Sequence, residues 1–356
     1  MKRNLPYKND FDTLSANVGL CVLLLGSPRQ HVKSGNWIRR RVAFLISAIL
    51  VLTLGVSSIS AQEIASYKHY TLNQQLINPA ASGMNGHKIM LNYVNRWNAF
   101  PGNPQTFTGA YNGPVGERIG LGAMLISDNL GSLNRTTGQL SYAYRLDIED
   151  TKLSIGLSTG YERYKLQASA LLGTGIDPND PIIADAAEGY DVFDAAVGVH
   201  AELPDGFTAG LALPNLIRTR VDNNSDNEST ESSLFKYFVL YAGYKAPLEE
   251  YNFEFEPSIQ VRNVRNAPFQ VDLNLLGYYA DDQLIGGFTY TIGGGNGANI
   301  LLGTRINKIN ILYSYGVSFA DFQTYNNGSH EISLIFDLFN PDETEDDQDD
   351  RRKRRR

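Results

Sequence analysis

The sequence predicts an all-β protein, a transmembrane outer-membrane β-barrel of about 14 antiparallel strands. Three observations lead to this prediction. Segments of about ten residues with apolar side chains at every second position recur along the chain. No apolar run after Gln62 is long enough for a membrane-spanning helix. An export signal precedes the first of these segments.

The export signal occupies the end of residues 1–61, which we interpret as an N-terminal extension and signal peptide. Three arginines at 39–41 precede an apolar stretch, residues 42–56, and small residues then lead to Ala61. A basic start, a short apolar run and a small-residue cleavage site are typical of secreted proteins, so we expect cleavage after Ala61. The chain's one cysteine, Cys21, lies upstream of this point, so no disulfide is expected.

The strands are predicted from alternation, which is clearest in residues 152–164. There Leu153, Ile155 and Leu157 fall on one face, and Ser154, Gly156 and Ser158 fall on the other. The first face suits lipid and the second suits a lumen. The predicted strands are residues 88–96, 105–113, 118–127, 134–147, 151–164, 190–201, 206–213, 234–246, 250–262, 267–279, 283–292, 297–306, 309–319 and 328–339.

The connections between these strands alternate in length, as in bacterial outer-membrane barrels. The expected short turns are 114–117, 149–150, 203–205, 247–249, 281–282 and 307–308. The long loops, about 165–189 and 214–233, fall on the other side. We therefore predict a barrel over 88–339, with a periplasmic N-terminal segment at 62–87 and a charged, disordered tail at 340–356, also periplasmic. The N-terminal segment at 62–87 is expected to lie outside the barrel, with a short helix around 70–76.

Composition and spacing give little support to chemistry or to nucleic-acid binding. The formal charge of −7 argues against a nucleic-acid surface. The histidines show no metal-ligand spacing, and Ser333 shares a strand face with Glu331 while His330 points the other way, so we expect neither a catalytic site, nor a metal, nor a cofactor. Residues 293–297 are interpreted as a glycine-rich hairpin loop rather than a phosphate site. The aspartates at 177–180, with Asp185, leave calcium binding open as an alternative to a solvated loop.

Four blocks, in order, resemble the PorP/SprF family. Residues 76–83 contain Asn78-Pro79-Ala80 and Gly83, similar to the family's opening Asn-Pro-Ala-x-x-Gly signature. Arg96 and Trp97, followed by 104–106, resemble its second block. Residues 119–122 with 128–131, which include Asp128 and Gly131, resemble the third, and 328–334 resemble the closing strand. The chain departs from the family at Ala81-Ser82 and in its charged tail.

The resemblance implies a non-enzymatic outer-membrane component of the type IX secretion system of Bacteroidetes, supporting secretion or surface attachment of substrate proteins such as gliding adhesins. Implied partners are periplasmic and outer-membrane type IX subunits, a secreted or surface-anchored substrate protein, and membrane lipid. The motif residues Asn78, Pro79, Ala80, Gly83, Arg96, Trp97, Asp128 and Gly131 would then have structural or docking roles. From the barrel alone, a porin or hydrophobic-solute channel stays open as the alternative.

Overall fold

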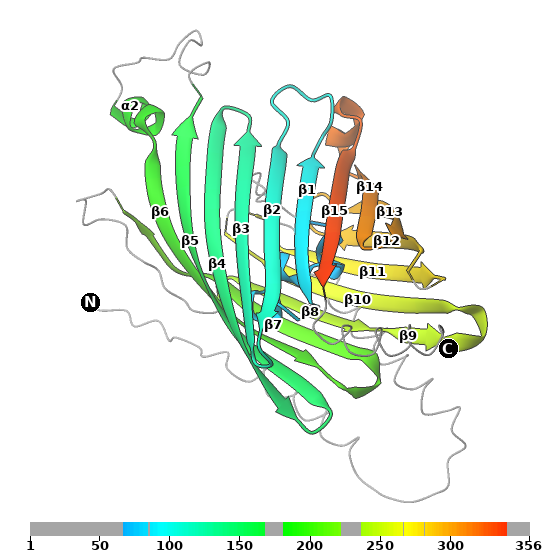
Figure 1. The fold of residues 1–356 in the computed structure, drawn as a ribbon. Helices are drawn as coiled ribbons and strands as arrows, with labels where there is room; N and C mark the ends of the chain where they lie inside the picture. Colours follow the sequence, from blue (N-terminus) through cyan, green and yellow to red (C-terminus); the bar gives the residue numbers. More distant parts are fainter. Residues whose placement is uncertain are drawn as a thin grey trace, which may run out of the picture. The chain divides into compact units, whose positions relative to one another are not determined.

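A computed structural model describes residues 67–84, 86–167, 181–221, 236–265, 267–280 and 282–339. Its strands form one antiparallel sheet that wraps around a lumen (Figure 1). They are β1 (His87–Asn95), β2 (Gln105–Val115), β3 (Ile119–Leu130), β4 (Leu133–Ile148), β5 (Thr151–Leu166), β6 (Tyr190–Glu202), β7 (Phe207–Arg220), β8 (Phe238–Tyr244), β9 (Ala246–Leu248), β10 (Phe253–Asn263), β11 (Gln270–Tyr279), β12 (Leu284–Ile292), β13 (Gly297–Ile306), β14 (Ile309–Ser318) and β15 (Ser329–Phe339).

The sheet closes on itself, which confirms the predicted barrel of 14 strands. The last strand, β15, pairs with β1, and β10 pairs with β11, so the order has no open edge strand. The 15 assigned strands make 14 positions, because β8 and β9 are two parts of one strand interrupted at Lys245 and both pair with β10. Closure satisfies the backbone hydrogen bonds that lipid cannot.

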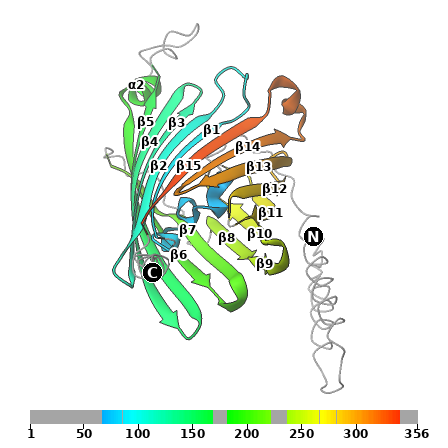
Figure 2. The same ribbon diagram turned by 45° about the vertical axis from the view of Figure 1, so that its right-hand side comes forward.

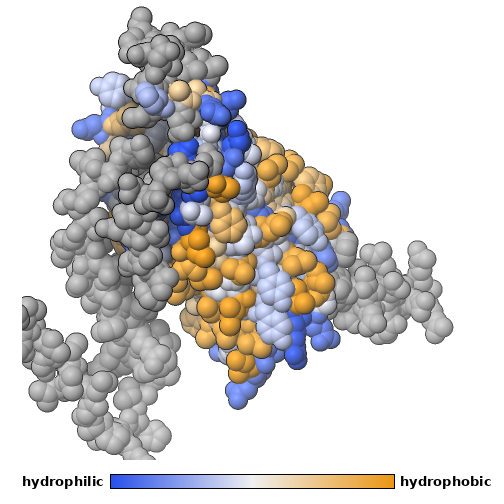
Figure 3. Space-filling model, turned by 90° about the vertical axis from the view of Figure 1, so that its left-hand side faces the viewer, coloured by the Kyte–Doolittle hydropathy of each residue, from blue (hydrophilic) through white to orange (hydrophobic). Residues whose placement is uncertain are grey.

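The predicted alternation is also confirmed. In β5 the side chains of Ile155, Leu157 and Tyr161 are each about half exposed on the outer surface, and those of Ser154 and Ser158 are buried in the lumen. Figure 3 shows apolar residues gathered on one outer face of the barrel. Such a surface is stable only against lipid. Among the described residues, no helix has both the length and the apolarity needed to cross a membrane.

The strand bounds agree with the prediction within a few residues except around β7 to β9. The prediction ended β7 at 213, but the strand continues to Arg220. Pro214-Asn215 resembles a turn, yet residues 214–216 form a bulge in β7 opposite Ala196 of β6, with a positive φ of 56° at Asn215, and pairing resumes at Ile217. The turn predicted at 247–249 is also shifted, because β9 contains Pro247 and the chain reverses at Glu249–Tyr251.

The two ends of the barrel differ as expected. One end, here called the turn side, carries the short connections, such as the one between β4 and β5. The other, the loop side, carries the β5–β6 connection with α2 (Pro181–Glu188) and the β14–β15 connection with the 3₁₀ helix Asp321–Tyr325. The signal peptide, the aspartates at 177–180, the loop from 222 to 233 and the tail from 340 lie outside the described residues.

The structure corrects the expectation that the segment at 62–87 lies outside the barrel. Its residues 67–84, here called the lumenal segment, lie inside the ring of strands (Figure 2). Three short 3₁₀ helices form it, His69–Thr71, Gln74–Leu76 and Pro79–Ala81, in place of the expected single helix. The expectation was wrong because inward-facing side chains of distant strands, which sequence periodicity alone does not reveal, supply the partners of this segment.

Candidate functional site

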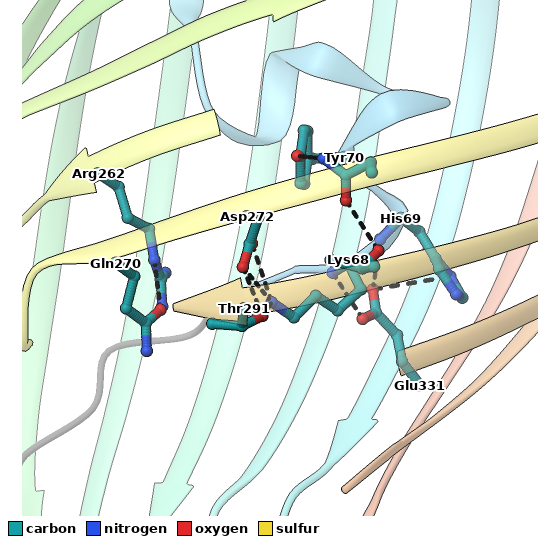
Figure 4. Close-up of polar contacts among 10 residues, drawn as sticks. Lys68, His69, Tyr70, Arg262, Gln270, Asp272, Thr291 and Glu331 are labelled. Carbon is teal, nitrogen blue, oxygen red and sulfur yellow. Dashed lines mark hydrogen bonds and ion pairs between the residues drawn. The ribbon is translucent and has the colours of Figure 1, made fainter. Parts of the chain in front are cut away.

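The lumenal segment and the strand side chains that hold it form the candidate site. Its first end is fastened by the Lys68 cluster: Lys68, His69, Asp272, Thr291, Glu331 and Ser333 (Figure 4). The Lys68 ammonium donates to both carboxylate oxygens of Asp272 at 2.9 Å and to the Thr291 hydroxyl at 2.9 Å. Only 1% of Asp272 is exposed. A buried carboxylate is stable only when it is paired in this way.

Glu331 binds the backbone N–H groups of Lys68 and His69. The backbone N–H of Lys68 donates to its Oε2 at 2.8 Å, and that of His69 donates to its Oε1 at 3.3 Å. The Asn92 amide also donates to Oε1, at 2.8 Å. One carboxylate from β15 therefore holds two consecutive peptide groups of the lumenal segment, independently of their side chains.

His69 lies against Ser333 but does not form a catalytic triad with Glu331. Its Nδ1 lies 2.7 Å from the Ser333 hydroxyl and 3.6 Å from Glu331 Oε1, so both neighbours lie at one ring nitrogen. A Ser-His-acid triad places them at opposite nitrogens. All three residues are at most 4% exposed. His69 belongs to the lumenal segment and not to a spanning strand, and burial lowers its pKa, with the Glu331 carboxylate acting in the opposite direction.

The middle of the lumenal segment is packed on apolar and aromatic side chains. Tyr70 is fully buried, makes an edge-to-face contact with Tyr241 at 6.0 Å, and accepts a hydrogen bond from Asn274 at 2.5 Å. Leu72 and Leu76 pack against a cluster of inward residues, here called the apolar ring: Met90, Ala110, Met124, Leu276, Tyr278, Ile285, Leu301, Leu312 and Ile335. This ring draws on strands from β11 through β15 to β3, so apolar contacts fill that part of the lumen.

The second end of the segment lies on inward-facing glycines, here called the glycine cradle: Gly120, Gly122, Gly156 and Gly198. A methyl group added at any of the four would overlap an atom of the segment, such as the Ser82 carbonyl oxygen at Gly120 or the Ala80 nitrogen at Gly156. The Ser154 hydroxyl donates to the Ala80 carbonyl at 2.7 Å. The glycines thus make room for the lumenal segment.

Four of the predicted motif residues meet in this second end. Asn78 caps the helix Pro79–Ala81 by accepting from the Ala80 N–H at 3.0 Å, and its amide donates to the Val199 carbonyl at 2.9 Å. Pro79 at the first helical position suits its fixed φ. Gly83 has a φ of 70°, and any side chain there would meet the Gly113 carbonyl.

The other four motif residues lie apart from these, at the loop-side ends of β1 and β3. Asp128, 1% exposed, accepts from the Thr106 hydroxyl at 2.5 Å and from Arg135 Nε at 2.8 Å. Gly131 forms the β3–β4 turn with a φ of 66°. The structure therefore divides the predicted residues into two groups at opposite ends of the barrel.

Arg96 and Trp97 begin the loop between β1 and β2. Arg96 is buried, and its backbone N–H donates to the Pro104 carbonyl at 3.0 Å. Trp97, with a φ of 50°, lies edge-on to Phe322 at a centroid distance of 5.1 Å. Arg96 therefore closes the β1–β2 loop on itself, and Trp97 joins that loop to the β14–β15 loop.

The sequence predicts no role for Lys68, His69, Asp272 or Thr291, and for Glu331 it predicts no more than an ordinary strand position. The alternation of side chains along each strand is the signal that could have found the strand residues of the Lys68 cluster. It places two charged residues, Asp272 and Glu331, at lumen-facing positions of their strands. A buried charge requires a partner, and Lys68 is a nearby cation in the chain preceding β1. Within the described ranges, no three His, Cys, Asp or Glu side chains are grouped as metal ligands.

This fold defines a class. A closed antiparallel barrel with an even number of strand positions, an apolar outer surface, and long connections at one end only is an outer-membrane β-barrel. Here the barrel holds its own N-terminal segment in the lumen. The chain belongs to the PorP/SprF family, because the family model described as "Type IX secretion system membrane protein PorP/SprF" matches residues 59–336.

Solved structures with a similar fold are other barrels. The CymD monoaromatic hydrocarbon channel is similar over 79% of this chain and 95% of its own, with 13% identity and a TM-score of 0.45. The KdgM porin covers 71% of this chain and 99% of its own, with 7% identity and a TM-score of 0.35. Outer membrane phospholipase A from Escherichia coli covers 72% and 93%, with 12% identity and a TM-score of 0.31. Such low values say nothing about function. No curated protein sequence matched the chain.

Proposed function

We propose that this protein is a non-enzymatic outer-membrane component of the type IX secretion system that supports secretion or surface attachment of substrate proteins, gliding adhesins among them. Membership of the PorP/SprF family supports the secretion role. The observation that supports the scaffold role is the position of the lumenal segment inside the barrel, where Leu72 and Leu76 pack against the apolar ring. A barrel closed in this way acts through its two ends.

The proposed orientation places the short turns and the tail after β15 in the periplasm, with the long loops outside the cell, as in other bacterial barrels. Periplasmic and outer-membrane type IX subunits then bind the turn side or the barrel wall, and a secreted or surface-anchored protein binds the loop side. Two exposed tyrosines mark the two ends. Tyr325 on the β14–β15 connection is 72% exposed, and Tyr251 at the β9–β10 turn is 70% exposed.

Photo-crosslinking from these two positions tests the proposal. A photoreactive phenylalanine analogue replaces Tyr325 in one strain and Tyr251 in a matched control strain, and adducts are identified by mass spectrometry. We expect secreted substrate from position 325 and periplasmic subunits from position 251. Recovery of periplasmic subunits from position 325 and of secreted substrate from position 251 would contradict the orientation. If neither position yields type IX components, and deletion leaves the surface proteins unchanged, the secretion role is wrong.

A porin or hydrophobic-solute channel is the second candidate, favoured by the barrel itself. The two functions differ in conductance of the purified protein in planar bilayers. A scaffold with the lumen filled by residues 67–84 gives brief or no openings, and a porin gives large steady currents. Steady currents from the unmodified chain would favour the channel.

A further inference from the structure

The two ends of the lumenal segment are held by different physical means. Residues 67–77, here called the arm, are fastened by the Lys68 cluster, in which side chains and a few N–H groups meet two carboxylates. Residues 78–84, here called the foot, are fixed by shape, because Gly120, Gly156 and Gly198 leave no space between the foot and strands β3, β5 and β6. Gly122 lies against both Gln75 of the arm and Ser82 of the foot. Water can replace the partners of a polar contact, but it cannot replace the close packing of the foot on the barrel wall.

The arm also has more buried polar atoms without a hydrogen-bond partner than the foot has. Three of its buried polar atoms, His69 Nε2, Thr71 Oγ1 and Gln75 Oε1, have no hydrogen-bond partner in the described structure, against one in the foot, Ser82 Oγ. Unpartnered buried polar groups regain hydrogen bonds when water reaches them. The arm therefore has more to gain from exposure than the foot.

The start of the arm, at Tyr67 and Lys68, faces the loop side. Asp272 and Glu331 are each the third residue of their strands, and Thr291 is the last but one of β12, and all three positions are next to loop-side connections. The foot lies nearer the turn side, where residue 87 begins β1. Anything that pulls on or displaces the arm from the loop side therefore meets the Lys68 cluster first.

We propose that the arm is releasable, that the foot is the fixed point on which it turns, and that release uncovers a cation-accepting site formed by Asp272, Thr291 and Glu331. With the arm out, both carboxylates lose their charged or N–H partners from the segment, and the apolar ring loses Leu72 and Leu76. The opened lumen then admits inorganic cations, or a lysine side chain of another peptide, in the place of Lys68. This proposal does not depend on the secretion role.

Thiol labelling of the full-length purified protein tests the proposal. In a Cys21→Ser background, a single cysteine replaces Gln74 in the arm or Ala81 in the foot, and maleimide labelling rates are compared with and without Lys68→Met. We expect Lys68→Met to raise the rate at least tenfold at position 74 and not at position 81. Lys68→Arg should retain slow labelling. Lys245→Met, which breaks the exposed pair with Glu254, is the matched control and should change neither rate.

Conductance supplies the second readout. In planar bilayers, Lys68→Met should open at least tenfold more often than the unmodified chain and should prefer K⁺ to Cl⁻. Adding Asp272→Asn and Glu331→Gln should keep the openings and remove the preference for K⁺. The proposal is overturned if labelling at position 74 does not respond to Lys68→Met, or if positions 74 and 81 respond together while heat-modifiable gel migration shows an intact barrel. Loss of that migration would indicate an unfolded barrel, and Lys68→Gln would then replace Lys68→Met.

Discussion

At the residue scale, the inward glycines are contact residues. Glycine on a strand face usually weakens a sheet, because it buries nothing and costs backbone entropy. Here Gly156 allows the backbone of the foot, and Gly198 allows the Asn78 side chain, to approach the barrel wall more closely than any other residue would permit. The abundance of inward glycine is as compatible with a wide pore as with a filled one when only the sequence is considered. The contacts of Ala80 and Asn78 show that these two glycines face the lumenal segment and not open space.

Substitution of Gly156 by alanine tests this role. The new methyl group would overlap the backbone of Ala80, so either the foot or β5 must shift. Overpacking of this kind costs about 1–3 kcal/mol of the free energy of unfolding. Gly138→Ala on β4 is the matched control, because no atom lies within 4 Å of the added methyl group and the change should stay within about 0.5 kcal/mol. Equilibrium unfolding in detergent measures both, and equal effects would show that the foot does not press on β5.

At the element scale, two loops at the same end act as one unit. The Asn98 N–H donates to the Gly328 carbonyl at 2.7 Å, and the Asn327 N–H donates to the Asn98 carbonyl at 2.8 Å. Trp97 and Phe322 add an edge-to-face contact between the same two loops. The β1–β2 and β14–β15 loops are far apart in sequence and adjacent in space because β15 pairs with β1. Barrel closure therefore reaches beyond the strands into the loop-side surface.

A double-mutant cycle on Trp97→Ala and Phe322→Ala should give a coupling energy of about 0.5–1.5 kcal/mol, typical of an edge-to-face aromatic pair. The comparison cycle pairs Trp97→Ala with Phe207→Ala, which lies at the turn-side start of β7. Distant substitutions add within about 0.3–0.5 kcal/mol, so this second cycle should show almost no coupling. Unfolding free energies of the four proteins in each cycle supply the data. Similar coupling in both cycles would mean that the loops do not form a local unit.

The strands could be predicted from the sequence and the lumenal segment could not, for one physical reason. Strand alternation is a local property, so the apolar positions of β5 or β14 identify the outer face without knowledge of any other strand. The place of Lys68 depends on Asp272 and Glu331, more than 200 residues away along the chain. The Asn78-Pro79 turn was predictable from residue type. Its burial against Gly198 was not, because only barrel closure brings β6 to that point.

At the scale of the whole molecule, the barrel and the lumenal segment form one folding unit in which each completes the other. The wall supplies Asp272 and Glu331, which without the arm would lose the Lys68 ammonium and the N–H groups of Lys68 and His69. The segment supplies almost no regular backbone pairing of its own and depends on the wall for its partners. A covalent link between the two should therefore stabilise the fold without distorting it, provided that it joins the foot and not the arm.

The pair Asn78→Cys with Gly198→Cys is suited to this link. The Asn78 Cγ, whose place a cysteine sulfur would take, lies 3.1 Å from an ideal Cβ at position 198. A disulfide sets about 3 Å between one sulfur and the opposite Cβ. Closing a loop of over a hundred residues stabilises by up to about 4.7 kcal/mol. Loss of the Asn78 cap offsets about 1 kcal/mol of this. Thiol titration and the temperature of gel-mobility change, oxidised against reduced, measure the outcome.

The matched control is Asn78→Cys with Gly160→Cys. Gly160, on β5, is an inward glycine like Gly198 on β6, but no atom of the lumenal segment is among its neighbours within 4 Å. It should retain two free thiols. The oxidised 78–198 link also separates foot from arm, since it fixes the first and leaves the second free. Openings of Lys68→Met in planar bilayers should therefore persist when the link is oxidised. If oxidation abolishes them, the segment moves as one body and the foot is not a fixed point.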